Sequence, residues 1–217
     1  MSLKEKNRYL NIKGVTLDKE QLQAYMQKIA TNYEVDKYSS IGTYPKYRVN
    51  ENFKFIIKTQ KILNEHLKKN IPIYPAGEWL LDNFYIIEEI VKNINNELNE
   101  RKYKNLPCIS NGMYKGFARI YVLATEIVAY TDNKIDEETL ELCLTSYEKK
   151  KTLSMEEMWN LPLFIYIALI ENIRAVCEKI YVSQMQKYKV EEMVERLVQK
   201  KTADKQEFKP TKENWYS

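Results

Sequence analysis

The chain has 217 residues, of which 44% are hydrophobic, and this is enough for one domain with a sizeable core. Five glycines and six prolines are few for a β-sandwich, a barrel or a dinucleotide-binding fold, and the abundant Lys, Glu, Leu and Ile favour helices. The net charge of +4, from 34 basic and 30 acidic residues, is nearly balanced and does not indicate nucleic-acid binding. We therefore predict an all-α protein, a single bundle of about six to seven helices with a polar C-terminal tail.

Seven helices are predicted from the spacing of apolar residues and from capping residues. Their ranges are 18–32, 51–69, 76–99, 113–131, 137–149, 155–183 and 187–202. The third has the clearest period, because apolar residues between Leu80 and Leu98 alternate steps of four and three. The segment IGTYPKYRV, which begins at Ile41, is interpreted as a linker.

Three of these helix starts carry capping residues. Asp18 with Gln21 three positions later, Asp136, and Ser154 with Glu157 each offer a side-chain acceptor to the unpaired N–H groups of a first turn. Helix starts near residues 18, 136 and 154 are therefore expected.

We predict that the chain divides into three segments. They are an N-terminal extension at 1–15, a helical domain at 16–201, and a polar tail at 202–217 that contains Trp215. We expect that tail to be disordered, or to be the start of a truncated continuation. The most apolar stretch, LPLFIYIALI from Leu161, is shorter than the roughly 20 residues that span a membrane. It predicts a core helix, and no transmembrane segment is expected in this chain.

The residue types that dominate enzyme and metal sites are scarce. Cys108, Cys143 and Cys177 are an odd number without a CxxC pair, which argues against a disulfide framework or a zinc site and favours a reducing, cytoplasmic compartment. The one histidine, His66, has charged neighbours and is expected on the surface. Phosphate-binding motifs are also lacking. We predict no catalytic residue, no cofactor and no metal.

A row of acids beside a tryptophan gives the first candidate site. Glu78 and Asp82 are four residues apart, and Asp82 and Glu89 are seven apart, so the three carboxylates share a helix face. Trp79 and Phe84 offer rings on which a sugar could stack. One interpretation is therefore a groove that binds a glycan or acts on it.

A buried polar network is the interpretation we prefer. Arg119 and Arg174 lie in apolar helices, where a guanidinium needs a carboxylate partner. The candidate partners are Glu78, Asp82, Glu89, Glu126 and Glu171. In this interpretation PAGEWLLDNFYIIEEI begins a central buried helix, Trp79 enters the core, and Asp82, Asn83 and Glu89 anchor neighbouring segments.

Three long stretches resemble one family. They are GEWLLDNFYIIEEI, LPCISNGMYKGFARIYVLATEIVAYTDNKIDEETL and LSMEEMWNLPLFIYIALIENIR. Together they resemble the N-terminal helical region of the cyclic β-1,2-glucan synthases, also labelled glycosyltransferase family 36 or glucoamylase-like proteins. The resemblance runs from about residue 16 to residue 190.

The resemblance implies a helical region that precedes the transferase domain of a very large, membrane-bound bacterial enzyme, on the cytoplasmic side of the membrane. Full-length members use UDP-glucose, and no catalytic position of theirs maps onto this chain. The expected function is a non-catalytic scaffold whose partners are the other domains of such a protein, with β-1,2-glucan as a further candidate partner.

Two alternatives stay open at this stage. The first is a module that binds or processes β-glucan through the acidic and aromatic residues. The second is a protein-interaction bundle in which the helix from Met155 to Ser183 forms a dimer seam.

Overall fold

The computed structural model describes residues 16–36, 44–131 and 134–207, and side chains as far as Leu197. The helices of these ranges are α2 (Lys19–Asn32), α3 (Lys46–Lys68), α4 (Pro75–Asp82), α5 (Phe84–Glu97), α6 (Glu100–Lys104), α7 (Arg119–Tyr130), α8 (Glu137–Glu148) and α9 (Met155–Glu207). The all-α prediction is confirmed. The predicted extension at 1–15 and Trp215 lie outside the described residues, whereas α9 continues six residues into the predicted tail.

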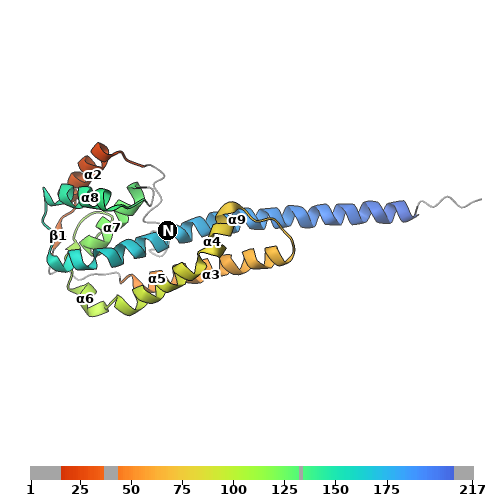
Figure 1. Ribbon diagram of the computed structural model, residues 1–217, viewed down its shortest axis with the longest axis horizontal. Coiled ribbons are helices and arrows are strands. Elements are labelled where there is room, and N and C mark those ends of the chain that lie inside the picture. The colour runs from red at the N-terminus through yellow and green to blue at the C-terminus, as the bar shows by residue number, and fades with distance from the viewer. Residues whose placement is uncertain (1–15, 37–43, 132–133, 208–217) are drawn as a thin grey trace, which may run out of the picture.

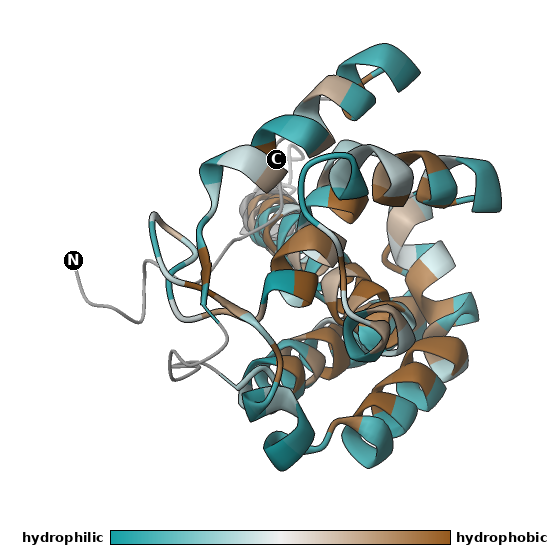
Figure 2. Cartoon of the chain, turned by 90° about the vertical axis from the view of Figure 1, so that its left-hand side faces the viewer, coloured by the Kyte–Doolittle hydropathy of each residue, from teal (hydrophilic) through white to brown (hydrophobic). Residues whose placement is uncertain are grey.

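Helix α9 is the spine of the molecule (Figure 1). Helices α3 and α7 make the most extensive packing against it, and α2 packs on α8. In Figure 1, α2 and α8 lie above the first half of α9, α3 and α5 lie below it, and the last part of α9 extends past the bundle. The apolar sides of the helices turn toward the interior of the bundle (Figure 2).

The core forms where α9 is buried between the other helices. Its largest fully buried side chains include Met26, Ile56, Leu63, Ile94, Tyr121 and Phe164. These residues come from α2, α3, α5, α7 and α9, so one continuous apolar cluster joins most of the helices. The described helices therefore share one core built around α9.

Each of the three predicted caps is present. The Asp18 side chain accepts from the Gln21 backbone N–H at 2.9 Å, and Asp136 accepts from Thr139 N at 2.8 Å. Ser154 Oγ accepts from Glu157 N at 3.3 Å, while Glu157 Oε2 accepts from Ser154 N at 2.9 Å. Local sequence therefore sets where α2, α8 and α9 begin.

The predicted helix 76–99 is divided at Asn83, which corrects our expectation. The Asn83 backbone has φ −104° and ψ 7°, outside the helical values. Its side-chain Nδ2 donates to the Trp79 carbonyl at 2.8 Å, an oxygen that also accepts from the Asn83 backbone N–H. A local side-chain bond of this kind competes with the helical pattern, so α4 ends and α5 starts in a new direction.

Other predicted boundaries are also wrong. Helix α3 begins at Lys46 rather than at residue 51, so residues 46–49 of the predicted linker are helical. Helix α7 begins at Arg119 rather than near 113, because Gly112 and Gly116 have positive φ values of 66° and 86° and form a turn. The helices predicted at 155–183 and 187–202 are one helix, α9. The residues between them, QMQ, include no glycine or proline that would end a helix.

A two-stranded ribbon was not predicted. β1 (Val35–Asp36) pairs antiparallel with β2 (Cys108–Ile109). Two residues per strand are too few to show an alternating pattern in sequence. The ribbon ties the chain after α2 to the loop that leads into α7.

Part of α9 is long and apolar enough to cross a membrane by length and composition alone. Within the protein, 56% of that stretch is buried, and core helices of soluble proteins have the same length and composition. The stretch packs against α3, α5 and α7. The expectation that this chain has no membrane-spanning segment stays a prediction.

Candidate functional site

The residues proposed from sequence separate into two places. Arg119, Glu126 and Glu171 are buried, as predicted for a polar network. Glu78, Asp82 and Glu89 are exposed on α4 and α5. The acidic row and the arginines therefore do not form one site.

Arg119 pairs with a residue that we predicted only as a cap. Its Nε donates to Glu157 Oε1 at 2.7 Å, and one terminal nitrogen donates to Oε2 of the same carboxylate. That nitrogen also donates to the Thr152 carbonyl at 3.1 Å. Glu157 is 0% exposed, so one buried carboxylate closes the capping box of α9 and neutralises the arginine of α7.

Glu171 links three helices. Arg48 Nε of α3 lies 2.6 Å from its Oε1, and the Tyr121 hydroxyl of α7 donates to the same oxygen at 2.6 Å. Burial raises the pKa of Glu171 above its usual value, and the Arg48 guanidinium opposes that shift. Arg48 was missed because it lies in the segment that we interpreted as a linker.

The Glu126 carboxylate of α7 accepts hydrogen bonds from α2 and from the turn before α7. The Tyr25 hydroxyl donates to its Oε2 at 2.6 Å, and the Tyr114 hydroxyl donates to Oε1. Burial is the largest cause that raises the pKa of each tyrosine, and the Glu126 carboxylate raises both further. The predicted arginine partner is therefore replaced by two tyrosines.

Arg174 stays on the flank of α9. Its Nη1 lies 2.8 Å from Glu178 Oε2, one helical turn away, and its guanidinium lies 4.7 Å from the centre of the Phe55 ring. Its ion-pair partner Glu178 was not among the predicted candidate acids, and the pairing of Arg174 with those candidates stays a prediction. The aromatic contact of Arg174 joins α9 to α3.

Trp79 is 53% exposed, which contradicts the prediction that it enters the core. Helix α4 has only eight residues, and it turns Gly77 and Leu80 inward. A Cβ added at Gly77 would lie 3.1 Å from the Leu63 side chain, so α4 approaches α3 closely on that side. Trp79 is left on the outer side, next to the exposed Glu78.

His66 is 5% exposed, so the prediction of a surface histidine is wrong. Its ring stacks on Tyr188 of α9, with ring centres 5.4 Å apart and an interplanar angle of 13°. α9 continues past the predicted end at 183 and covers this part of α3, which explains the error. Nδ1 of His66 is buried without a hydrogen-bond partner among the described residues.

Burial and the nearby Lys69 lower the pKa of His66, while Glu191 and Glu65 partly oppose the shift. The unfolded chain binds a proton near pH 6.5 and the folded chain binds it only at a lower pH. We expect the free energy of unfolding to fall as the pH drops from about 6.5 through the folded-state pKa.

Urea unfolding of the wild type and of His66→Phe at pH 7.5 and pH 5.5 measures this effect. The stability difference between the two proteins should move in favour of the variant at pH 5.5. If the stability difference between the two proteins is the same at both pH values, the lowered pKa of His66 is contradicted.

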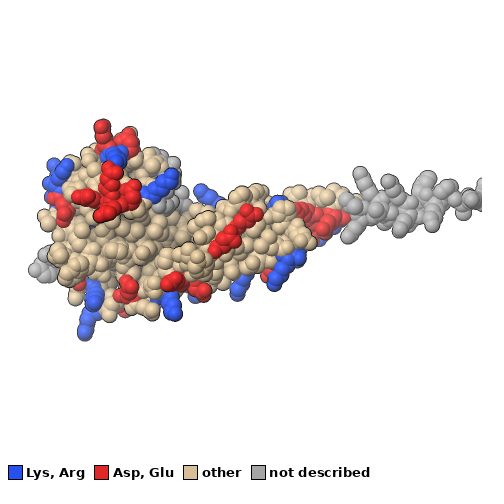
Figure 3. All heavy atoms as spheres, viewed as in Figure 1, with Lys and Arg blue, Asp and Glu red and all other residues tan. Residues whose placement is uncertain are grey.

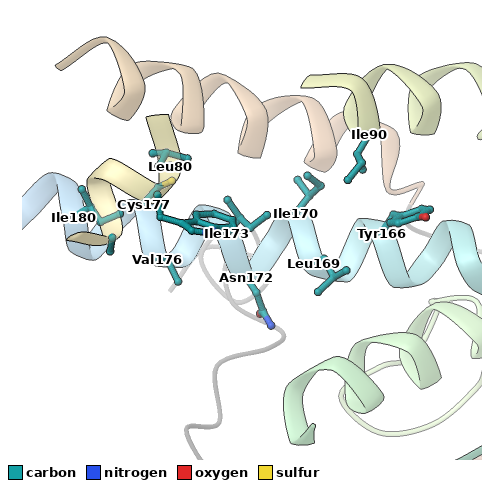
Figure 4. Close-up of a pocket in the computed structure, with 12 residues that line it drawn as sticks. Leu80, Ile90, Tyr166, Leu169, Ile170, Asn172, Ile173, Val176, Cys177 and Ile180 are labelled. Atoms are coloured by element: carbon teal, nitrogen blue, oxygen red, sulfur yellow. The ribbon is translucent and has the colours of Figure 1, made fainter. Parts of the chain in front are cut away.

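An apolar groove of about 420 Å³ opens along α9. It is lined by Ala76, Trp79 and Leu80 of α4, by Ile90 of α5, and by eight residues of α9 between Tyr166 and Ile180. Figure 4 shows these side chains arrayed along α9 below Leu80 and Ile90. We call this feature the α9 groove.

The α9 groove is chemically suited to apolar side chains rather than to a sugar. Asn172 is the one amide in its lining, and sugar hydroxyls would lose hydrogen bonds to water there without replacing them. Sequence reasoning missed the groove. The signal was present, however, in the apolar residues of α9 that recur at steps of three and four.

Comparison with known proteins finds a protein that is similar to this chain. No family model matches it. Over 152 residues, 70% of this chain, it is 29% identical to the cyclic β-(1,2)-glucan synthase NdvB of Rhizobium meliloti (strain 1021). The chain is related to the cyclic β-1,2-glucan synthases. The relationship that the three quoted stretches predicted is thus confirmed.

The matched stretch spans 5% of the length of the synthase. This chain therefore corresponds to a small part of its glucan synthase relative. Within the described residues, no group of three or more His, Cys, Asp and Glu side chains could hold a metal ion. The buried carboxylates of this bundle, Glu126, Glu157 and Glu171, accept hydrogen bonds from arginines and tyrosines of other elements, and these bonds join the helices.

Proposed function

We propose that this chain is a non-catalytic α-helical scaffolding module of a cyclic β-1,2-glucan synthase-like protein. Its role is to pack against other domains of that protein on the cytoplasmic side. The α9 groove carries the proposal, because a sizeable apolar surface on a folded bundle is typical of an interface. The sequence relationship supports the choice of protein.

The buried acids support a structural role for the interior. Glu126, Glu157 and Glu171 each accept hydrogen bonds from residues on other elements. None of these three carboxylates lines the α9 groove, so none is placed to take a proton from a molecule bound there. We therefore assign no catalytic residue, and we propose that the glycosyltransferase activity belongs to other domains of the synthase-like protein.

A segment exchange in the relative tests the scaffolding role. The matched 152-residue segment of NdvB would be deleted, or replaced by the corresponding part of this chain. We expect deletion to lower both the yield of protease-resistant synthase and its glucan synthesis, and we expect the replacement to recover part of both. A deletion variant with unchanged yield and activity would contradict the proposal.

Glucan binding is a second candidate function, which the exposed Trp79 beside Glu78 and Asp82 favours. Calorimetric titration with linear and cyclic β-1,2-glucans tests it. Saturable heat that disappears in Trp79→Ala and Asp82→Ala, with circular dichroism unchanged, would support a binding module. An absence of heat at millimolar glucan would exclude it.

A further inference from the structure

The first half of α9 presents an apolar stripe on its outer side. Met155 and Trp159 are exposed near the start of the helix, and Tyr166 and Val176 are 47% and 46% exposed within the α9 groove. Together with residues 162, 169 and 173, these positions alternate steps of four and three. This is the spacing at which one helix packs its side chains between those of a second helix.

Helix α9 buries a different side in the bundle. Glu157, Phe164 and Glu171 lie seven residues apart and are all buried, and they follow a line on the opposite side of the helix. The stripe is therefore not the core-facing side of α9. The packing of the described helices leaves Met155, Trp159, Tyr166 and Val176 exposed on this side.

Acidic residues on the exposed surface of α4 and of the first half of α5, which we call the acidic wall, flank the groove without lining it. From Pro75 to Val91 the sequence carries Glu78, Asp82, Glu88 and Glu89 and no lysine or arginine, and all four acids are exposed. Acidic side chains run over α4 in Figure 3, next to uncharged surface over α9. A partner with positive charges along one edge would match this wall, and an anionic lipid surface would be repelled by it.

We infer that the α9 groove binds an amphipathic α-helix that carries apolar residues at steps of three and four and Lys or Arg along the edge that faces α4. The helix comes from a domain outside these 217 residues. This inference rests on the proposed scaffolding function and specifies its docking surface. The apolar residues of the partner fill the groove, and its basic edge pairs with Glu78 and Asp82.

Two synthetic peptides of 18 residues test the inference. Both carry leucines at steps of three and four, and their polar edges differ, with lysine in one and glutamate in the other. The full chain carrying Trp159→Phe and Trp215→Phe retains Trp79 as its sole tryptophan. We expect the lysine peptide to bind saturably and to shift the emission of Trp79 to shorter wavelength, because the ring loses water contact.

The charge of the wall predicts the order of affinities. The glutamate peptide should bind at least tenfold more weakly, and the affinity of the lysine peptide should fall with added salt. Glu78→Lys with Asp82→Lys should reverse the preference between the two peptides. Equal binding of both peptides at all salt concentrations would overturn the basic edge of the proposed partner.

Val176→Asp places a charge in the lining of the groove and should abolish binding. Val182→Asp is the matched control, since Val182 is also about half exposed on α9 but does not line the groove. Both variants should keep the helical circular dichroism of the wild type. Absence of binding, or equal binding by Val176→Asp and Val182→Asp, would overturn the inference.

Light scattering of the full chain at several concentrations tests whether a second copy of the chain fills the groove instead. A dimer that Val176→Asp disrupts and Val182→Asp does not would mean that a second copy fills the groove, and this result would overturn the inference. The segment exchange in NdvB does not depend on these peptides. Recovery of synthesis there without peptide binding would leave the scaffold proposal standing and reject the docking surface alone.

Discussion

Replacing Glu157 with alanine is expected to lower the free energy of unfolding by about 3–5 kcal/mol, because it leaves the guanidinium of Arg119 buried without its carboxylate. The same change removes the two hydrogen bonds that Glu157 Oε2 accepts from the backbone N–H and the hydroxyl of Ser154 at the start of α9. Urea unfolding followed by circular dichroism measures the loss. The variant should unfold at a clearly lower urea midpoint with a similar slope.

The neighbouring Glu156 supplies the control. It is exposed in the same helical turn, so Glu156→Ala should change stability by less than about 0.5 kcal/mol. Replacing the pair together, as Arg119→Met with Glu157→Met, should recover part of the loss, since no unpaired charge remains buried. Equal stabilities of Glu157→Ala and Glu156→Ala would show that the buried pair is not needed.

Glu126→Ala is expected to cost about 2–4 kcal/mol, because two tyrosine hydroxyls would lose their acceptor inside the protein. Tyr25 and Tyr114 belong to different segments, α2 and the turn before α7, so both should loosen together. Thermal unfolding and near-ultraviolet circular dichroism of the tyrosines measure the effect.

Glu126→Gln is the conservative comparison. Its amide oxygen can still accept from one hydroxyl, so the loss should be smaller than with alanine. Changing both tyrosines to phenylalanine in the Glu126→Ala background removes the unpaired hydroxyls and should add little further loss. A wild-type melting temperature for Glu126→Ala would contradict the assigned role of this carboxylate.

The helix starts of α2, α8 and α9 could be predicted from sequence because their physics is local. A cap such as Asp18 acts on a backbone N–H three residues away, and its pattern is complete within one turn. The apolar periods likewise follow from helix geometry alone. For this reason the fold class and the positions of α2 and α8 were correct before any tertiary information.

The division at Asn83 and the late start of α7 also have local causes. The apolar residues around them, however, form a stronger pattern that indicates a continuous helix. The apolar period from Leu80 to Leu98 continues through Asn83, so the pattern indicates one helix while the side chain of Asn83 ends it. At Gly112 and Gly116, apolar residues nearby suggested a helix although the backbone takes positive φ.

The sequence by itself determined the class of the fold, the helix caps, the relationship to glucan synthases, and that Arg119 needs a buried carboxylate. Tertiary structure alone decided which carboxylate, since Arg119 and Glu157 are 38 residues apart and Arg48 and Glu171 are 123 apart. It also decided that His66 is buried and Trp79 exposed. Burial and ion pairing depend on which helix covers which face, and that information lies in packing between distant segments rather than in spacing along the chain.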